Sequence, residues 1–157
     1  MATAADPDRT ELGREALSAE PPTYEDILAA AQRLKGLAVR TPLFEPPALA
    51  ERTGGQVLIK AETFQRTGSF KFRGAYNRIC QIPEADRPKG VVAFSSGNHA
   101  QGVAAAAKLL GMPATIVMPR DAPAIKLKRT RALGAKVIEY DRASEAREAI
   151  GQSIAAE

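Results

Sequence analysis

Short apolar runs alternate with amphipathic segments through most of the chain. The runs that have the length and β-branched content of strands cover residues 57–61, 91–94, 114–118 and 136–140. Each is followed by apolar residues at helical spacing, which predicts helices over 69–82, 98–110, 122–133 and 143–156. Because strands that alternate with helices favour right-handed crossovers, the pattern predicts an α/β fold: an open parallel sheet with helices on both faces.

Two further helices are predicted before the first of these strands. Thr23 and Asp26 form a capping arrangement at the start of one, and Gly36 is suited to end it in a left-handed conformation. A proline pair suits the start of the other, which ends at Gly54. Between them, residues 39–44 contain a Thr-Pro step, which favours an extended link.

The first 22 residues differ from the rest in composition. They contain five acidic residues and no apolar stretch, so they match neither a secretory signal nor an organellar transit peptide. We interpret residues 1–22 as a flexible polar tail with a short helix near residues 11–19. A cytoplasmic location follows, and the single cysteine, Cys80, agrees with a reducing compartment.

Charge and composition exclude several classes of function. The chain has 157 residues, enough for one compact domain, and a net charge of +4 without a dense basic stripe, so nucleic acid and membrane surfaces are not expected partners. No apolar run approaches the roughly 20 residues of a membrane helix. Cys80 and the single histidine, His99, are too few for a metal site built from such ligands. The basic run at 126–131 is interpreted as a solvated helix face.

Two junctions between a strand and a helix carry unusual residues. The first, T-G-S-F-K-F-R-G at 67–74, has Gly68 for a tight turn and Ser69 as a candidate helix cap. Lys71 then falls in the first helical turn, where a partly buried cation is destabilised by the positive end of the helix. A lysine that gives up its proton readily is the nucleophile needed to condense with an aldehyde, and a solvated surface lysine is the alternative.

The second junction, S-S-G-N-H-A-Q-G at 95–102, places hydroxyls, an amide and a glycine directly before an alanine-rich helix. Such a set of donors at a helix start is suited to a carboxylate or a phosphate, and an ordinary helix cap is the alternative. His99 could donate to an anion or hold a structural hydrogen bond. No dinucleotide-binding glycine pattern is present. Gly97 and Gly102 have the spacing of a P-loop, but Val103 stands where a P-loop has its lysine.

Taken together, residues 60–75 (K-A-E-T-F-Q-R-T-G-S-F-K-F-R-G-A) and 95–102 resemble the serine/threonine dehydratase family. These are pyridoxal-phosphate enzymes with the tryptophan-synthase-β type of fold, and they include threonine ammonia-lyases and serine racemases. Thr-Pro-Leu at 41–43 and Val-Met-Pro at 117–119 fit the resemblance in order and spacing. The likeness implies pyridoxal 5′-phosphate as cofactor and a small β-hydroxy amino acid as substrate.

The resemblance also implies roles by position. Lys71 matches the lysine that binds the cofactor and moves the Cα proton, Phe70 packs beside the cofactor, and Asn98 hydrogen-bonds its 3′-oxygen. The loop that holds the substrate carboxylate is matched by Ser95, Ser96, Gly97, Asn98 and His99. In racemase-type members the counterpart of Ser96 is an acid/base on the opposite face of the cofactor ring.

The departure from the family concerns length. Members are roughly twice as long, and their second half carries a glycine-rich loop for the cofactor phosphate, whereas this chain has no run of three glycines. We therefore expect residues 23–157 to be the N-terminal part of a dehydratase catalytic domain, with a small domain over about 55–157. Alone, such a fragment is expected to be inactive, and the full-length protein to be a homo-oligomer.

Three functions fit these residues. The leading hypothesis is an ammonia-lyase that converts L-threonine or L-serine to a 2-oxo acid and ammonia by β-elimination. A serine or aspartate racemase of the same family is the second, because Ser96 permits it. The third is a non-catalytic module that binds a small anion, although such a module has no chemical need of Lys71.

Overall fold

The computed structural model describes residues 21–156. It divides the chain into two compact units, with the boundary between Gln32 and Arg33. The tail predicted over 1–22 lies outside the described residues except for its last two, and the short helix predicted near 11–19 lies outside them entirely.

The first described helix, α2, spans Tyr24–Leu34 and starts as the sequence predicts. The backbone N–H of Asp26 donates to Thr23 Oγ1 at 3.2 Å, and the N–H of Thr23 donates to the Asp26 carboxylate at 2.9 Å. This reciprocal pair satisfies two N–H groups that a helix start leaves free. Gly36 follows the helix with φ 76°, the left-handed conformation expected of a glycine there.

A three-stranded parallel sheet forms the centre of the second unit, in the order β3-β4-β5. The strands are β3 (Val91–Phe94), β4 (Ala114–Pro119) and β5 (Lys136–Tyr140). Strand β4 lies in the middle and is the most buried, with Ile116, Val117 and Met118 fully inaccessible to solvent. These three strands and their parallel arrangement confirm the predicted α/β class.

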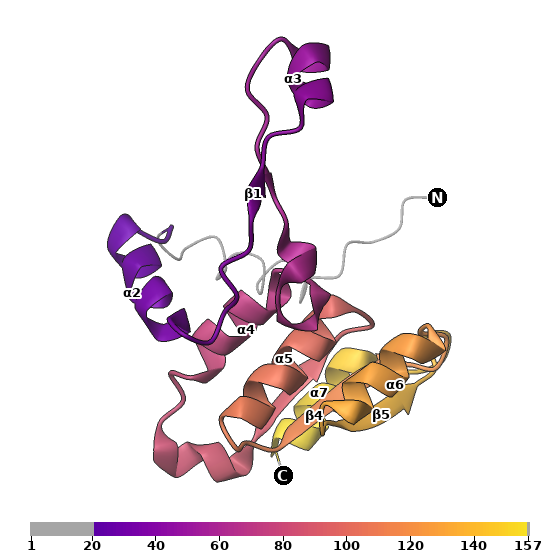
Figure 1. Cartoon of the computed structure of the whole chain (residues 1–157). Helices are drawn as coiled ribbons and strands as arrows, with labels where there is room; N and C mark the ends of the chain where they lie inside the picture. The colour runs from indigo at the N-terminus through magenta and orange to yellow at the C-terminus, as the bar shows by residue number, and fades with distance from the viewer. Residues whose placement is uncertain (1–20, 157) are drawn as a thin grey trace. The chain divides into compact units, whose positions relative to one another are not determined.

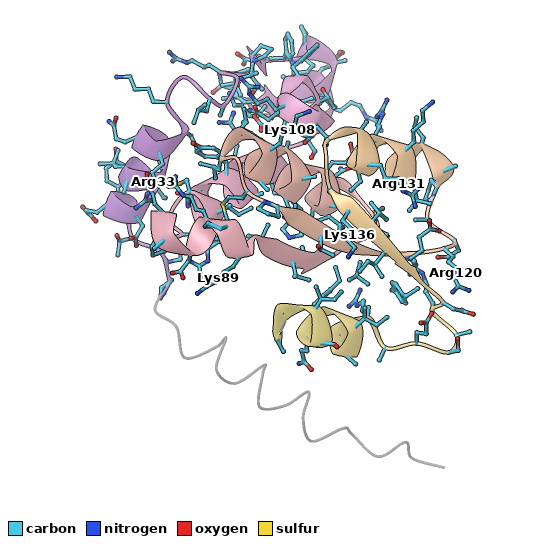
Figure 2. All side chains as sticks on the ribbon, turned by 90° about the horizontal axis from the view of Figure 1, so that it is seen from below. Arg33, Lys89, Lys108, Arg120, Arg131 and Lys136 are labelled. Atoms are coloured by element: carbon cyan, nitrogen blue, oxygen red, sulfur yellow. The ribbon has the colours of Figure 1, made fainter. Side chains whose placement is uncertain are left out.

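Helices cover both faces of this sheet. Figure 2 shows α5 (Asn98–Leu109) and α6 (Ala124–Ala132) on one side and α7 (Arg147–Ala156) on the other. Helix α4 (Lys71–Ile79) packs against α5 (Figure 1). The alanines of α5 are buried, and because their side chains are small, the backbones of these layers approach closely.

The prediction for residues 57–61 is wrong in one respect. Only β2 (Ile59–Lys60) is a strand, and it pairs antiparallel with β1 (Leu43–Phe44) instead of joining the parallel sheet. Helix α3 (Pro47–Thr53) connects the two and ends at Gly54, as expected. The chain reverses through α3 without a crossover onto the sheet, so the partner that β2 meets is the preceding extended link.

Two helix starts also differ from the prediction. Helix α7 begins at Arg147 instead of residue 143, because the Asp141 carboxylate accepts the N–H of Ala143 at 2.8 Å and holds a turn there. Helix α4 begins at Lys71, so Ser69 does not cap it. Short 3₁₀ segments complete the elements: η1 (Glu62–Phe64), η2 (Arg66–Gly68) and η3 (Glu84–Lys89). Within residues 21–156, no helix has both the length and the apolar character to cross a membrane.

Candidate functional site

Lys71 is presented at the start of α4 by a tight turn. Thr67 and Gly68 both have positive φ angles, 64° and 72°, and Thr67 is the one such non-glycine residue among those described. A left-handed threonine costs about 1 kcal/mol, so the surrounding contacts must hold this turn in place. The Nζ atom of Lys71 lies 4.7 Å from the ring centroid of Phe70, within the range of a cation–π contact.

The surroundings of Lys71 are more open than expected. Its side chain is exposed, and Phe70 is 57% exposed, so the described residues do not supply the partial burial that the sequence suggests. The hydroxyl of Ser69, by contrast, is buried and has no hydrogen-bond partner. A buried hydroxyl without a partner is unusual, because burying such a group unpaired costs free energy.

The backbone at Lys71 is fixed by close packing against α5. A Cβ placed on Gly102 would lie 3.1 Å from the carbonyl carbon and oxygen of Lys71 and 3.2 Å from the nitrogen of Phe72. The Phe72 side chain, directly after Lys71, is fully buried in the core. The backbone at Lys71 is therefore held by close packing against α5, while its side chain is exposed beside the Phe70 ring.

The second junction forms a loop between β3 and α5. Ser95, Ser96 and Gly97 are half-buried, whereas Asn98 and His99 are exposed as the first two residues of α5. The N–H of Gly97 donates to Ser95 Oγ at 3.2 Å, and no side chain caps the start of α5. The uncapped helix start leaves backbone N–H groups available to an anion.

His99 brings the two junctions together. It lines a cavity of about 540 Å³ that Phe70 and Lys71 also line. Partial desolvation of the ring and the positive charge of Lys71 both lower the pKa of His99, which favours the neutral form of the ring. The other predicted loop residues, Ser95, Ser96, Gly97 and Asn98, do not line this cavity.

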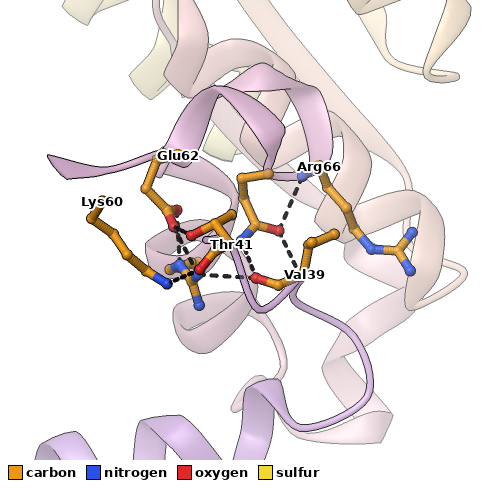
Figure 3. Close-up of polar contacts among 7 residues, drawn as sticks. Val39, Thr41, Lys60, Glu62 and Arg66 are labelled. Carbon is orange, nitrogen blue, oxygen red and sulfur yellow. Dashed lines mark hydrogen bonds and ion pairs between the residues drawn. The ribbon is translucent and has the colours of Figure 1, made fainter. Parts of the chain in front are cut away.

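A network of polar side chains lies next to this turn (Figure 3), and the sequence pattern does not predict it. Arg73 Nε and Nη2 donate to the two carboxylate oxygens of Glu62, each at 2.8 Å, and Thr41 Oγ1 donates to the same carboxylate at 2.6 Å. The Arg73 hydrogen bond is the largest cause that lowers the pKa of Glu62 to about 2. Arg73 stands two residues after Lys71, so the ion pair ties the first turn of α4 to the preceding chain.

The same network holds the extended segment at 37–41. The side chain of Gln65 donates to the carbonyl of Val39 and accepts its N–H, both at 2.9 Å. Lys60 Nζ donates to the carbonyl of Thr41, and Arg66 Nε to the carbonyl of Leu37. These side chains replace the strand pairing that the segment lacks. Because the pairs are separated by 11 to 29 positions, no periodic pattern could have revealed them.

Because of this network, we expect part of the free energy of unfolding to depend on pH. The pKa of Glu62 falls from 4.5 to about 2 on folding, so its contribution is complete above pH 4.5 and is lost as the pH falls towards 2. This part amounts to about 3.5 kcal/mol at most, at roughly 1.4 kcal/mol per pKa unit. Urea unfolding of wild-type protein and Glu62→Gln between pH 6 and pH 3 measures it. The wild type should lose part of this stability by pH 3, which is still above the folded pKa of Glu62, whereas the variant should lack that part of the slope. Equal slopes would contradict the prediction.

Known proteins with similar sequences and structures act on amino acids. An L-threo-3-hydroxyaspartate ammonia-lyase of Pseudomonas sp. is 60% identical over 133 residues, which cover 85% of this chain and 42% of that protein. An L-threonine ammonia-lyase of Thermotoga maritima is 56% identical over 116 residues, or 74% of this chain and 29% of that protein. The structure of maize serine racemase is similar with a TM-score of 0.78 and 40% identity, over 83% of this chain and 40% of that one.

The chain thus spans about two fifths of the length of the Pseudomonas relative. A family model described as pyridoxal-phosphate dependent enzyme matches residues 34–157, which is most of the chain and includes both junctions. The parallel sheet with helices on both faces agrees with the similar structure from maize. The chain therefore belongs to the family of pyridoxal-phosphate dependent enzymes.

Proposed function

We propose that the chain supplies the lysine and the carboxylate-binding loop of an ammonia-lyase that acts on small β-hydroxy amino acids. L-Threonine and L-serine are the substrates that the sequence suggests, and the names of the relatives add L-threo-3-hydroxyaspartate. The observation that carries the proposal is the shared cavity, in which Lys71 and His99 bring the two junctions together.

The described residues fit the reactive end of pyridoxal phosphate. An exposed primary amine is the group that condenses with an aldehyde, and Lys71 presents one in a cavity whose volume lies in the range of small-molecule sites. The Phe70 ring lies beside that amine, and the buried, unpaired hydroxyl of Ser69 lies two positions before it. Phe70 and Lys71, which line the cavity, would hold the cofactor, and the resemblance adds Asn98 from the start of α5. When bound, it supplies an electron sink that stabilises negative charge at the substrate Cα.

The chain's own residues then have distinct tasks. Ser95, Ser96 and the free N–H groups at the start of α5 would hold the substrate carboxylate and so fix the direction of the Cα–H bond. Lys71 Nζ would take the Cα proton, since the Lys71 backbone packs closely against α5 and its exposed side chain lines the cavity. His99, in its favoured neutral form, can donate one hydrogen bond without adding a second positive charge beside Lys71.

Racemisation of serine is a second candidate, favoured by the likeness to maize serine racemase. It needs a proton donor on the face of the cofactor opposite Lys71, and the half-buried Ser96 is the residue we assign to it. Formation of D-serine from L-serine at a rate comparable to pyruvate formation would favour the racemase. Homo-oligomeric assembly and a cytoplasmic location stay predictions from the sequence.

A chimeric enzyme tests the ammonia-lyase. The matched 133 residues of the Pseudomonas relative are replaced by those of this chain, and release of ammonia and 2-oxo acid is measured with the three substrates. We expect equal amounts of the two products, at a rate within about tenfold of the unaltered relative, or about 1.4 kcal/mol in barrier. The 157-residue chain by itself should show no turnover, because it has no glycine-rich run for the cofactor phosphate.

The chimera also has a result that would overturn the proposal. A chimera that folds and binds pyridoxal phosphate, as its absorbance spectrum reports, yet releases no ammonia from any of the three substrates would exclude this role for the chain. A chimera that binds a carboxylic acid but not the cofactor would favour the non-catalytic module.

A further inference from the structure

Lys126 departs from the solvated face to which the sequence assigns it. It lies in the first turn of α6, and a Cβ placed on Gly97 would be 3.7 Å from its Nζ atom. Lys126 is half-buried, whereas Lys128 and Arg129 on the same helix are exposed. The ammonium group of Lys126 therefore rests against the loop to which we assign the substrate carboxylate.

No carboxylate of the described residues forms an ion pair with Lys126. None of the ion pairs formed within residues 21–156 involves Lys126 or Lys71. The charge that bears on His99 is also positive, that of Lys71. The start of α5, which adds a partial positive charge, has no side-chain cap. Several positive groups thus converge on one loop, an arrangement that a doubly charged anion would stabilise more than a singly charged one.

The proposed chemistry decides which cation remains for the substrate. Lys71 Nζ is the atom that would bond to the cofactor, so its charge is not available to hold a second carboxylate. The loop N–H groups and hydroxyls suffice for one carboxylate, since neutral donors commonly bind one. Among residues 21–156, Lys126 is then the ammonium group that lies against this loop without another task.

We infer that Lys126 binds the second carboxylate of a dicarboxylic β-hydroxy amino acid and so selects 3-hydroxyaspartate over threonine and serine. This inference rests on the proposed function, because it takes the loop at 95–99 as the site of the first carboxylate. Threonine carries a methyl group and serine a hydrogen where 3-hydroxyaspartate carries its second carboxylate. Neither can form a hydrogen bond that offsets the partial desolvation of the Lys126 ammonium group. A β-carboxylate offers a charge-assisted hydrogen bond.

The inference can be tested on the 157-residue chain without turnover. The amide resonances of ¹⁵N-labelled protein are followed by NMR during titration with succinate, a dicarboxylate, and with propionate, a monocarboxylate. We expect both acids to shift the Gly97 amide. Lys126→Gln should weaken succinate binding at least about tenfold and leave propionate binding unchanged, since one charge-assisted hydrogen bond is lost. Lys128→Gln, on the exposed side of the same helix, is the matched control and should change neither.

Three results would overturn the inference: no shift of Gly97 with succinate in the unsubstituted chain, equal weakening of both acids in Lys126→Gln, or no weakening of either. The chimera separates this failure from that of the proposed function. If it deaminates its substrates and Lys126→Gln lowers kcat/KM equally for 3-hydroxyaspartate and threonine, only the inference about Lys126 fails. If the unsubstituted chimera deaminates nothing, the proposed function fails.

Discussion

Lys71→Ala is expected to lower ammonia release by the chimeric enzyme about 10³-fold or more, while the protein remains folded. The activity should collapse because the substitution removes both the amine that binds the cofactor and the base at the substrate Cα. Stability should change by less than about 0.5 kcal/mol, because the Lys71 side chain is exposed and makes no ion pair with any described residue. Initial rates and the thermal midpoint, measured on the same preparation, give the two numbers.

A second lysine provides the control for this experiment. Lys108 is exposed in the last turn of α5 (Figure 2), so Lys108→Ala should leave both the rate and the midpoint unchanged. If ammonia release persisted in Lys71→Ala, the catalytic assignment would be wrong, and the anion-binding module would become the better explanation of the loop at 95–99.

Glu62→Ala is expected to destabilise the chain by about 2–3 kcal/mol. The Glu62 side chain is only 18% exposed and accepts hydrogen bonds from Arg73 and Thr41, so its removal leaves a half-buried guanidinium without a counter-charge. Breaking a fully buried pair costs roughly 3–5 kcal/mol, and the 31% exposure of the Arg73 side chain reduces that figure. Urea unfolding at pH 7 measures the loss.

The ion pair of Lys89 with Asp86 is the matched control. Their nitrogen and oxygen atoms are 2.7 Å apart, but both side chains are largely exposed, so Asp86→Ala should leave the unfolding midpoint unchanged. Adding Arg73→Met to Glu62→Ala should recover part of the stability, because it removes the unpaired charge. Equal losses of unfolding free energy in Glu62→Ala and Asp86→Ala would show that the network stabilises the fold no more than an exposed ion pair does.

The parallel sheet was predictable because each of its strands is marked in the sequence by a short apolar run. Residues 91–94 and 136–140 are apolar runs bounded by turns, and the structure has strands over the same residues. The short ribbon of β1 and β2 was not predictable, because its pairing depends on an extended link with no periodicity. The start of α4 differs from the prediction for a related reason. Serine is a common helix cap, but the turn at Thr67 places the Ser69 hydroxyl in the interior.

The candidate site could be predicted in part, because sequence motifs identify site residues but not the burial and contacts of those residues. The two junctions were recognisable by glycines and hydroxyls next to helix starts, and His99 does line the cavity with Lys71. The partners of Glu62 were hidden because they come from segments far apart in the sequence. Lys126 was hidden because the other basic residues of α6 are exposed, and only the packing of α6 beside the loop distinguishes it.

The central claim, that Lys71 is the cofactor lysine, is tested most directly by chemical trapping. The chain is incubated with pyridoxal phosphate, borohydride makes any lysine–cofactor bond permanent, and peptide mass spectrometry locates the label. The account predicts most of the label on Lys71 at low cofactor concentration, ahead of the exposed Lys108 and Lys128. Label spread evenly over the exposed lysines, or concentrated on a lysine other than Lys71, would contradict it.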